Sequence, residues 1–191
     1  MTGNEAVVEI LKREGVEYLF CFPANTLIDA TAVEGIRPIL TRTERTLVNM
    51  ADGFSRVSNG KRIGVCTVQD GPGVENAFAG VAQAFADSSP ILFLPGQGAR
   101  ERWGIRPEFN VEQHYGGVTK WVARANGADR LPELLRRAFS RLKSGRPGPV
   151  MVGIPRDVAA EELTEALAYT PPRPVRSAGD PGDVAAAVKA L

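Results

Sequence analysis

The stretch Ile63–Leu94, with the sequence IGVCTVQDGPGVENAFAGVAQAFADSSPILFL, decides the fold of this chain. It opens on a short continuous apolar run, Ile63–Val68, and closes on another, Ile91–Leu94. Between these runs, apolar residues recur every three or four positions from Val74 to Phe85, which is the period of an amphipathic helix. Short apolar runs joined by a helix are typical of parallel strands that are buried on both faces. The stretch therefore predicts a strand, a helix and a second strand of one parallel sheet.

The same alternation extends in both directions along the chain. Four further apolar runs predict strands at Tyr18–Phe22, Ile39–Leu40, Lys120–Ala123 and Val150–Val152. Helical stripes lie at Ala6–Leu11, Leu47–Phe54 and Leu131–Leu142. Together they predict an α/β fold: an open, doubly wound parallel sheet of about six strands with helices on both faces. Ligands of such sheets bind outside the carboxyl ends of the strands, so the loops after Phe22, Leu40, Val68 and Leu94 are the expected sites.

The composition changes near the end of the chain. Residues 1–168 have the alternating pattern and are expected to form one domain, whereas residues 169–182 contain four prolines and read as a linker. Residues 183–191 are rich in alanine and predict a helix with Asp180 or Asp183 as its N-cap. We expect residues 183–191 to begin a truncated middle domain, which would make the chain the first part of a longer protein.

Charge and hydropathy exclude several classes of function. Lysine plus arginine number 23 against 22 aspartates and glutamates, and a net charge of +1 gives no field for attracting nucleic acid or an anionic membrane. The chain has no amino-terminal signal pattern and no apolar run of about 18 residues. Cys21 and Cys66 lie in apolar runs and are expected to be buried thiols in a reducing compartment. These features predict a cytoplasmic protein without nucleic-acid or membrane partners.

Two loops contain candidate functional residues. Glu44 would lie in the first turn of a helix capped by Thr41 or Thr43, where the helix dipole alone favours a carboxylate. Gly71-Pro72-Gly73 opens the next helix and allows a close approach of backbone to a ligand. The spacing is not that of a phosphate loop, because no Lys-Ser or Lys-Thr follows the glycines. It is not that of a dinucleotide loop either, because Asn76 stands where a third glycine belongs. A nucleotide-binding domain is therefore a weak alternative, and we assign no metal ligand to this chain.

An ordered set of short motifs is more specific than any one of them. The motifs are Arg42-Thr43-Glu44, Met50–Arg56, Gly71-Pro72-Gly73 with Asn76, Ala84–Pro90, Gly96-Gln97, Ser144–Val150 and Ile154–Val158. In order and spacing this set resembles the amino-terminal, pyrimidine-binding domain of thiamine-diphosphate-dependent enzymes of the acetolactate synthase group. The resemblance covers roughly residues 3–160.

The resemblance implies thiamine diphosphate as the cofactor and a 2-keto acid as the substrate. It identifies Glu44 as the catalytic glutamate, whose carboxyl group bonds to a pyrimidine ring nitrogen and so activates the amino group that removes the reactive thiazolium proton. The same resemblance implies further cofactor-binding residues at Ala24, Gln69, Pro72 and Asn76, and substrate-side residues at Asn25 and Gln97. It also implies a homo-oligomer, expected to be a dimer, in which a carboxyl-terminal domain binds magnesium and the diphosphate.

Departures from the family pattern leave the substrate open. The group usually has glycine where this chain has Ala24, histidine at Thr43 and glutamine at Arg45. The diphosphate motif, Gly-Asp-Gly with a later Asn, does not occur in these residues, so we expect residues 1–191 alone to be inactive. The expected function is an amino-terminal fragment of an acetolactate-synthase-like carboligase or decarboxylase. The alternatives are a separate pyrimidine-domain subunit of a split decarboxylase and a non-catalytic binding module on the same fold.

Overall fold

The computed structural model describes residues 1–191 and confirms the predicted α/β class. All strand pairs in its single seven-stranded sheet are parallel, and the order is β2-β1-β3-β4-β7, with β5 and β6 also pairing with β7. The strands are β1 (Tyr18–Cys21), β2 (Arg37–Leu40), β3 (Gly64–Thr67), β4 (Ile91–Phe93), β5 (Gly96–Gln97), β6 (Trp121–Arg124) and β7 (Val150–Pro155).

Strand β5 continues strand β4 in the same register. Leu92 pairs with Val150 and Gly96 pairs with Ile154, so both partners advance by four residues. The ladder is interrupted at Pro95, which has no N–H to donate, although its carbonyl accepts a hydrogen bond from the Ile154 N–H at 2.9 Å. With β4 and β5 taken as one interrupted strand, the prediction of about six strands is confirmed.

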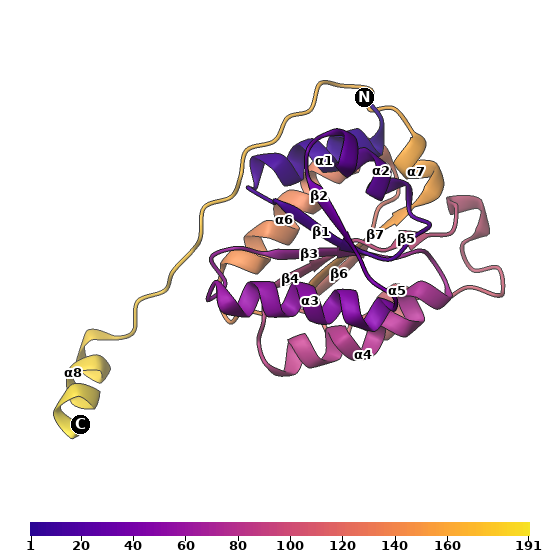
Figure 1. Ribbon diagram of the computed structural model, residues 1–191. Helices are drawn as coiled ribbons and strands as arrows, with labels where there is room; N and C mark the ends of the chain where they lie inside the picture. The colour runs from indigo at the N-terminus through magenta and orange to yellow at the C-terminus, as the bar shows by residue number, and fades with distance from the viewer.

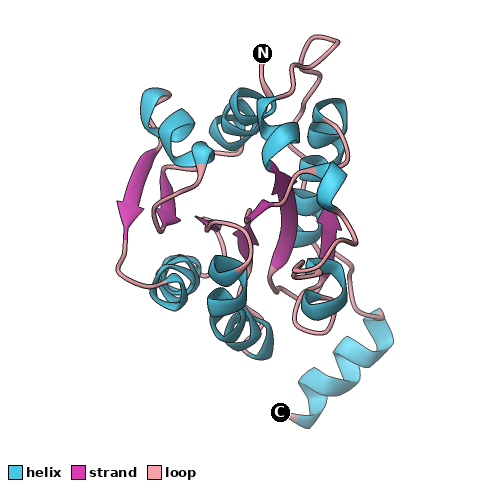
Figure 2. Ribbon diagram, turned by 90° about the vertical axis from the view of Figure 1, so that its right-hand side faces the viewer, coloured by secondary structure: helices cyan, strands magenta, loops and turns pink.

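Helices cover both faces of the sheet, as the doubly wound arrangement requires (Figure 1). One layer contains α1 (Gly3–Arg13), α2 (Thr26–Val33) and α6 (Leu131–Lys143). The other contains α3 (Glu44–Val57), α4 (Pro72–Ala86) and α5 (Val111–Tyr115). Figure 2, turned by 90°, shows the strands between the two layers. The remaining helices are the short α7 (Arg156–Ala160), the terminal α8 (Pro181–Ala190) and two 3-10 turns at Arg100–Arg102 and Ala128–Arg130.

The core consists of two apolar clusters, one on each side of the sheet. Neighbouring residues of β3 show the separation, because Val65 packs against α1 and α6 while Cys66 packs against α3 and α4. Side chains of a strand point alternately to its two faces, so a strand covered on both faces is apolar except where a buried polar side chain is hydrogen-bonded, as Thr67 is to the Leu94 carbonyl. All four residues of β3 are buried, which explains why the strands read as continuous apolar runs.

Three helices were not predicted. Helix α2 buries only Leu27 and Thr31, so its sequence has a weak apolar stripe. Helices α5 and α7 have five residues each, too few for a helical period to stand out. Residues 98–118, between the predicted strands Ile91–Leu94 and Lys120–Ala123, therefore contain one short helix that the sequence pattern does not indicate.

The folded domain extends one residue into the linker predicted to start at residue 169. Tyr169, the first residue of the predicted linker, is 7% exposed and belongs to the core. After it the chain is extended as far as Asp180, which caps α8 as predicted. Helix α8 has no buried residue and lies away from the body of the molecule (Figure 1). No helix is both long and apolar enough to cross a bilayer.

Candidate functional site

The predicted site residues gather at the carboxyl edge of the sheet. Asn25 follows β1, Glu44 follows β2, Gln69 follows β3, and Gln97 ends β5. The strands are parallel, so these four loops meet at one edge, as the fold class predicts. Their side chains form two groups, one around Glu44 and one around a cavity beside Asn25.

Glu44 is the first residue of helix α3. Thr43 is the N-cap, and its hydroxyl accepts a hydrogen bond from the Thr46 N–H at 3.2 Å. The capping requirement is thus met by Thr43, and the expectation of a first-turn glutamate is confirmed. Glu44 is nevertheless only 8% exposed, which is unusual for a carboxylate whose only role is to favour a helix end.

Asn76 is the side chain that contacts Glu44. Its Nδ2 donates to Glu44 Oε2 at 3.4 Å, the only hydrogen bond that the Glu44 side chain makes. Oε1 of the same carboxylate has no partner in the protein. The structure therefore brings together two residues that are 32 positions apart, and it leaves one oxygen of a largely buried carboxylate available to a ligand.

Helix α4, which contains Asn76, begins at a turn that requires glycine. Gly71 has φ 57° and ψ −116°, a conformation that residues with a Cβ avoid. A Cβ on Gly73 would lie 2.7 Å from Gln69 Cγ, so the loop and the helix are in close contact. No side chain caps this helix, and the exposed Pro72 is its first residue. The open helix N-terminus beside Glu44 leaves backbone N–H groups free for a ligand.

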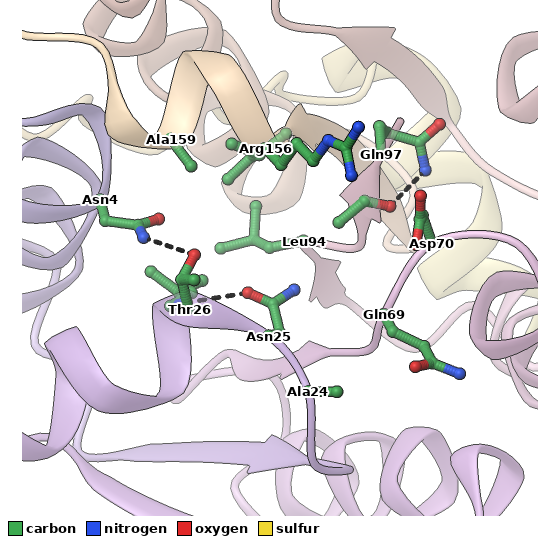
Figure 3. Close-up of a pocket in the computed structure, with 13 residues that line it drawn as sticks. Asn4, Ala24, Asn25, Thr26, Gln69, Asp70, Leu94, Gln97, Arg156 and Ala159 are labelled. Carbon is green, nitrogen blue, oxygen red and sulfur yellow. Dashed lines mark hydrogen bonds between the residues drawn. The ribbon is translucent and has the colours of Figure 1, made fainter. Parts of the chain in front are cut away.

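The second group lines a cavity of about 170 Å³ (Figure 3). Ala24, Asn25, Gln69 and Gln97 all contribute to its wall, whereas Glu44, Pro72 and Asn76 do not. The cavity is much smaller than the roughly 300 Å³ or more that is usual for a small-molecule site. This cavity by itself would hold only part of a ligand.

The amide of Asn25 is fully used within the protein. Its Nδ2 donates to Thr67 Oγ1 at 2.9 Å and to the Val68 carbonyl at 2.8 Å, and its Oδ1 accepts from the Leu27 N–H at 2.9 Å. These bonds join the loop after β1 to the end of β3 and cap helix α2. Asn25 therefore shapes the wall of the cavity.

Gln97 and Gln69 differ in how they are held. Gln97 is 6% exposed, and its Nε2 donates to the Gly96 carbonyl at 2.6 Å. A Cβ on Gly153 would lie 2.9 Å from Gln97 Cγ, so only glycine fits beneath this side chain. Gln69 is partly exposed and its side chain makes no hydrogen bond. Of the two amides, Gln69 is the one free to rotate toward a ligand.

Two residues without a predicted role line the same region. Asp70 and Arg156 border the cavity of Figure 3 and, with Gln97, a neighbouring cavity of about 250 Å³. Arg156 is exposed and belongs to no ion pair, whereas the adjacent Asp157 pairs with Arg100 at 2.6 Å. Burial opposes ionisation of Asp157, but the hydrogen bonds from Arg100 hold its pKa below the ordinary value. The Ile154–Val158 motif contained Arg156, but nothing in its pattern distinguished a cavity residue from a structural one.

The two cysteines are buried, as expected, and the single histidine lies on the short helix α5. Cys21 and Cys66 are buried and unpaired, and burial raises the pKa of Cys21 to about 11. His114 is exposed on α5 and stacks on the Phe109 ring with centroids 4.6 Å apart. No group of three or more metal-binding side chains occurs in the structure.

The chain matches one family of known proteins. Residues 1–117 match the family described as "Thiamine pyrophosphate enzyme, N-terminal TPP binding domain". The chain is 36% identical over 168 residues to a probable acetolactate synthase large subunit of Methanocaldococcus jannaschii, a match that covers 85% of this chain and 28% of that protein. It is 34% identical over 204 residues to the acetolactate synthase large subunit of Haemophilus influenzae, covering 100% of this chain and 35% of that protein.

A relative named for a different activity is similar to the same degree. The chain is 35% identical over 187 residues to a probable 2-ketoarginine decarboxylase of Pseudomonas aeruginosa, covering 92% of this chain and 33% of that protein. The chain thus spans about a third of the length of the relatives it matches.

Proposed function

Because this chain belongs to the thiamine pyrophosphate enzymes and contains their N-terminal TPP-binding domain, we propose that it activates thiamine diphosphate for reactions of 2-keto acids. Its homology to acetolactate synthase large subunits favours a carboligase that first removes carbon dioxide from one keto acid and then joins the remainder to a second carbonyl compound. The single observation that supports this proposal most strongly is the state of Glu44, a largely buried carboxylate with one unpaired oxygen.

The residues at the carboxyl edge fit the aminopyrimidine of that cofactor. Glu44 Oε1 has no hydrogen-bond partner in the protein, yet it is not among the fully buried unpaired atoms, so a ligand can reach it. A protonated ring nitrogen is a donor that suits this oxygen. Helix α4 begins without a side-chain cap at the exposed Pro72, and its next turn contains Asn76, the residue that bonds to Glu44. We assign Glu44, Pro72, Asn76 and Gln69 to the pyrimidine, and Ala24 to the loop that approaches it.

The residues of this chain act by positioning and by proton transfer. When bound, thiamine diphosphate supplies the electron sink for breaking the bond next to the keto carbonyl. Asn76 holds Glu44 Oε2 and so fixes the orientation of the carboxyl group. With the cofactor bound, Glu44 Oε1 would hold and exchange a proton at the pyrimidine ring nitrogen, in the low-dielectric surroundings that its burial provides. Asn25 and Gln97 shape the neighbouring cavity, where we place the keto acid.

The remainder of the cofactor requires a second domain. Cavities of about 170 and 250 Å³ are too small for the whole molecule, and the chain offers no cluster of metal ligands. We propose that magnesium and the diphosphate bind to a domain outside residues 1–191 and that the complete site forms in a homo-oligomer, a dimer at the least. Met50 and Val57 of α3 are apolar residues that are 38% and 88% exposed. Their exposure supports a partner that covers the outer surface of α3. The buried free cysteines support a cytoplasmic location.

A decarboxylase that does not join a second carbonyl compound is the other candidate. It is favoured by the similarity to the probable 2-ketoarginine decarboxylase, which is as great as the similarity to the synthases. Both candidates need the same cofactor activation, so the role of Glu44 is common to them.

Replacing the carboxyl group of Glu44 by an amide tests the proposal. In an enzyme containing this domain, saturated with thiamine diphosphate and magnesium, Glu44→Gln should lower carbon dioxide release from pyruvate by about 100-fold or more, because an amide cannot exchange the proton. Exchange of the cofactor C2 proton with deuterium, followed by NMR, should slow by a similar factor. The midpoint of thermal unfolding should hardly change, since Thr43 still caps the helix.

Glu75→Gln is the matched control. Glu75 lies in the first turn of α4, is exposed and makes no contact with Glu44. Its replacement removes the same charge beside a helix N-terminus and should leave both rates unchanged. Near-normal proton exchange in Glu44→Gln would show that Glu44 has only a structural role.

A further inference from the structure

A hollow of about 600 Å³ opens at the end of the sheet where the strands begin, opposite to the carboxyl ends where Glu44 lies. It lies where β6 and β7 begin and is bounded by the last turns of α4 and α6. The residues around it include three cations, Lys120, Arg141 and Arg146, and no aspartate or glutamate. We call this region the basic hollow. Its volume is in the range of small-molecule sites, unlike the two cavities at the carboxyl edge.

The three cations have no carboxylate partner anywhere in the protein. None of them belongs to an ion pair, although other lysines and arginines on α1, α3 and α6 do. Arg146 Nε donates to Ser88 Oγ at 2.8 Å, and the Arg141 guanidinium lies 5.6 Å from the centre of the Trp121 ring. Both arginines therefore keep free N–H donors for an anion.

Lys120 is held in place by backbone carbonyls. Its ammonium donates to the carbonyl of Arg141 and, at 2.8 Å, to that of Ser144, which leaves its third N–H unused. Burial lowers the pKa of Lys120, and the nearby positive charge of Arg141 lowers it further. The second cause shows that the two cations lie close enough to repel each other.

The helix ends do not cancel this charge. Helices α4 and α6 both end at the basic hollow, and each helix C-terminus has a partial charge of roughly −0.5. Two such ends amount to about one negative charge against three full positive ones. An excess of positive charge remains to bind an anion.

Phe85 adds an apolar surface to the same hollow. Its side chain is 39% exposed, although it belongs to the apolar stripe of α4. An exposed aromatic face beside unpaired guanidinium groups suits a ligand that joins a planar ring to phosphate groups. We propose that the basic hollow binds a nucleotide, with the phosphates on Arg141 and Arg146 and the base on Phe85.

Calorimetric titration of residues 1–191 with three probes tests the proposal. ADP provides ring and phosphates, pyrophosphate lacks the ring, and adenosine lacks the phosphates. ADP should bind most tightly, pyrophosphate more weakly, and adenosine not measurably. In the double variant Arg141→Gln/Arg146→Gln, ADP affinity should fall about 10-fold or more, because the charge-assisted hydrogen bonds to the phosphates are lost. Phe85→Leu should reduce the preference for ADP over pyrophosphate.

The matched control is Arg136→Gln/Arg137→Gln. Arg136 and Arg137 lie on α6, as Arg141 does, and they pair with Glu133 outside the basic hollow. Replacing both changes the net charge by the same amount as the first double variant does. Their replacement should leave ADP affinity unchanged, and so should Glu44→Gln at the other edge of the sheet. The proposal is overturned if ADP does not bind, if both double variants weaken it equally, or if Glu44→Gln abolishes binding. Pyrophosphate binding as tightly as ADP would overturn the assignment of a nucleotide.

Discussion

Ala24 holds a backbone conformation that suits glycine. Its φ of 78° lies in the left-handed region, where a Cβ atom makes unfavourable contacts with the backbone. Ala24→Gly should therefore raise the free energy of unfolding by about 1 kcal/mol, after the greater flexibility of glycine in the unfolded chain is counted. Urea denaturation of the two proteins measures the difference.

Ala32→Gly is the control for that substitution. Ala32 is exposed within helix α2, where glycine is unfavourable, so the same change should lower the free energy of unfolding by about 0.5 to 1 kcal/mol. Equal signs for the two substitutions would show that Ala24 is not strained.

Individual residues of the site could be predicted only in part. The contact between Glu44 and Asn76 follows from two helix starts at the same edge of a parallel sheet, so the sequence pattern places both there. The resemblance to a family drew attention to Ala24 because glycine is usual at that position, but only the structure gives the positive φ that explains it. Arg156 was not predicted, because an unpaired arginine has no pattern in the sequence.

At the scale of elements, strand β3 and helix α3 approach too closely for any side chain at Gly64. A Cβ there would lie 2.1 Å from the carbonyl oxygen of Ala51, and a backbone atom cannot turn aside as a side chain can. Gly64→Ala must move the helix that contains Glu44. We expect it to lower the free energy of unfolding by about 3 kcal/mol, measured by urea denaturation.

Gly53 provides the matched comparison, because it lies on α3 and a Cβ added to it would have no neighbouring atom within 4 Å. Gly53→Ala should raise the free energy of unfolding by about 1 kcal/mol, through helix propensity alone. If Gly64→Ala proved equally harmless, the close contact between β3 and α3 would not exist in solution.

The elements were predicted best where burial leaves a periodic signal. Strands covered on both faces are continuous apolar runs, and long helices with one buried face have a stripe, so β3, α4 and α6 were found. Helix α2 has few buried positions and α5 has five residues, so neither produces a period. The break between β4 and β5 at Pro95 depends on pairing with β7, which the local sequence does not record.

At the scale of the whole molecule, a buried ion pair joins segments that are far apart in the chain. Lys143, at the end of α6, pairs with Glu14, which ends α1. Tyr169 Oη donates to the other oxygen of Glu14 at 2.5 Å, and its backbone carbonyl accepts from Arg13 at 3.0 Å. Burial, together with the hydrogen bond to Glu14, raises the pKa of the Tyr169 hydroxyl. The sequence pattern places Tyr169 in the linker because several prolines follow it closely in the chain. These contacts instead hold Tyr169 in the core.

The two members of this pair should respond unequally to substitution. The Glu14 side chain is 0% exposed and that of Lys143 is 23% exposed, so only the lysine can turn to water if its partner is lost. Lys143→Met leaves a buried carboxylate without a cation and should lower the free energy of unfolding by about 3 to 5 kcal/mol. Glu14→Gln should lower the free energy of unfolding by clearly less than Lys143→Met does. The double variant Glu14→Gln/Lys143→Met should be more stable than Lys143→Met alone.

A pH series separates this electrostatic cause from lost packing. In Lys143→Met the buried carboxylate is relieved by taking up a proton, so the folded state binds more protons than the unfolded state, and stability must rise as pH falls. The difference from the parent protein in urea denaturation should therefore narrow as the pH is lowered from neutral over the range in which both proteins remain folded. In Glu14→Gln no buried carboxylate is left, so the difference from the parent should show no such narrowing. A constant deficit for Lys143→Met across this range would attribute its effect to packing of the lysine stem, and Glu14 would then not depend on a cation for its place in the core.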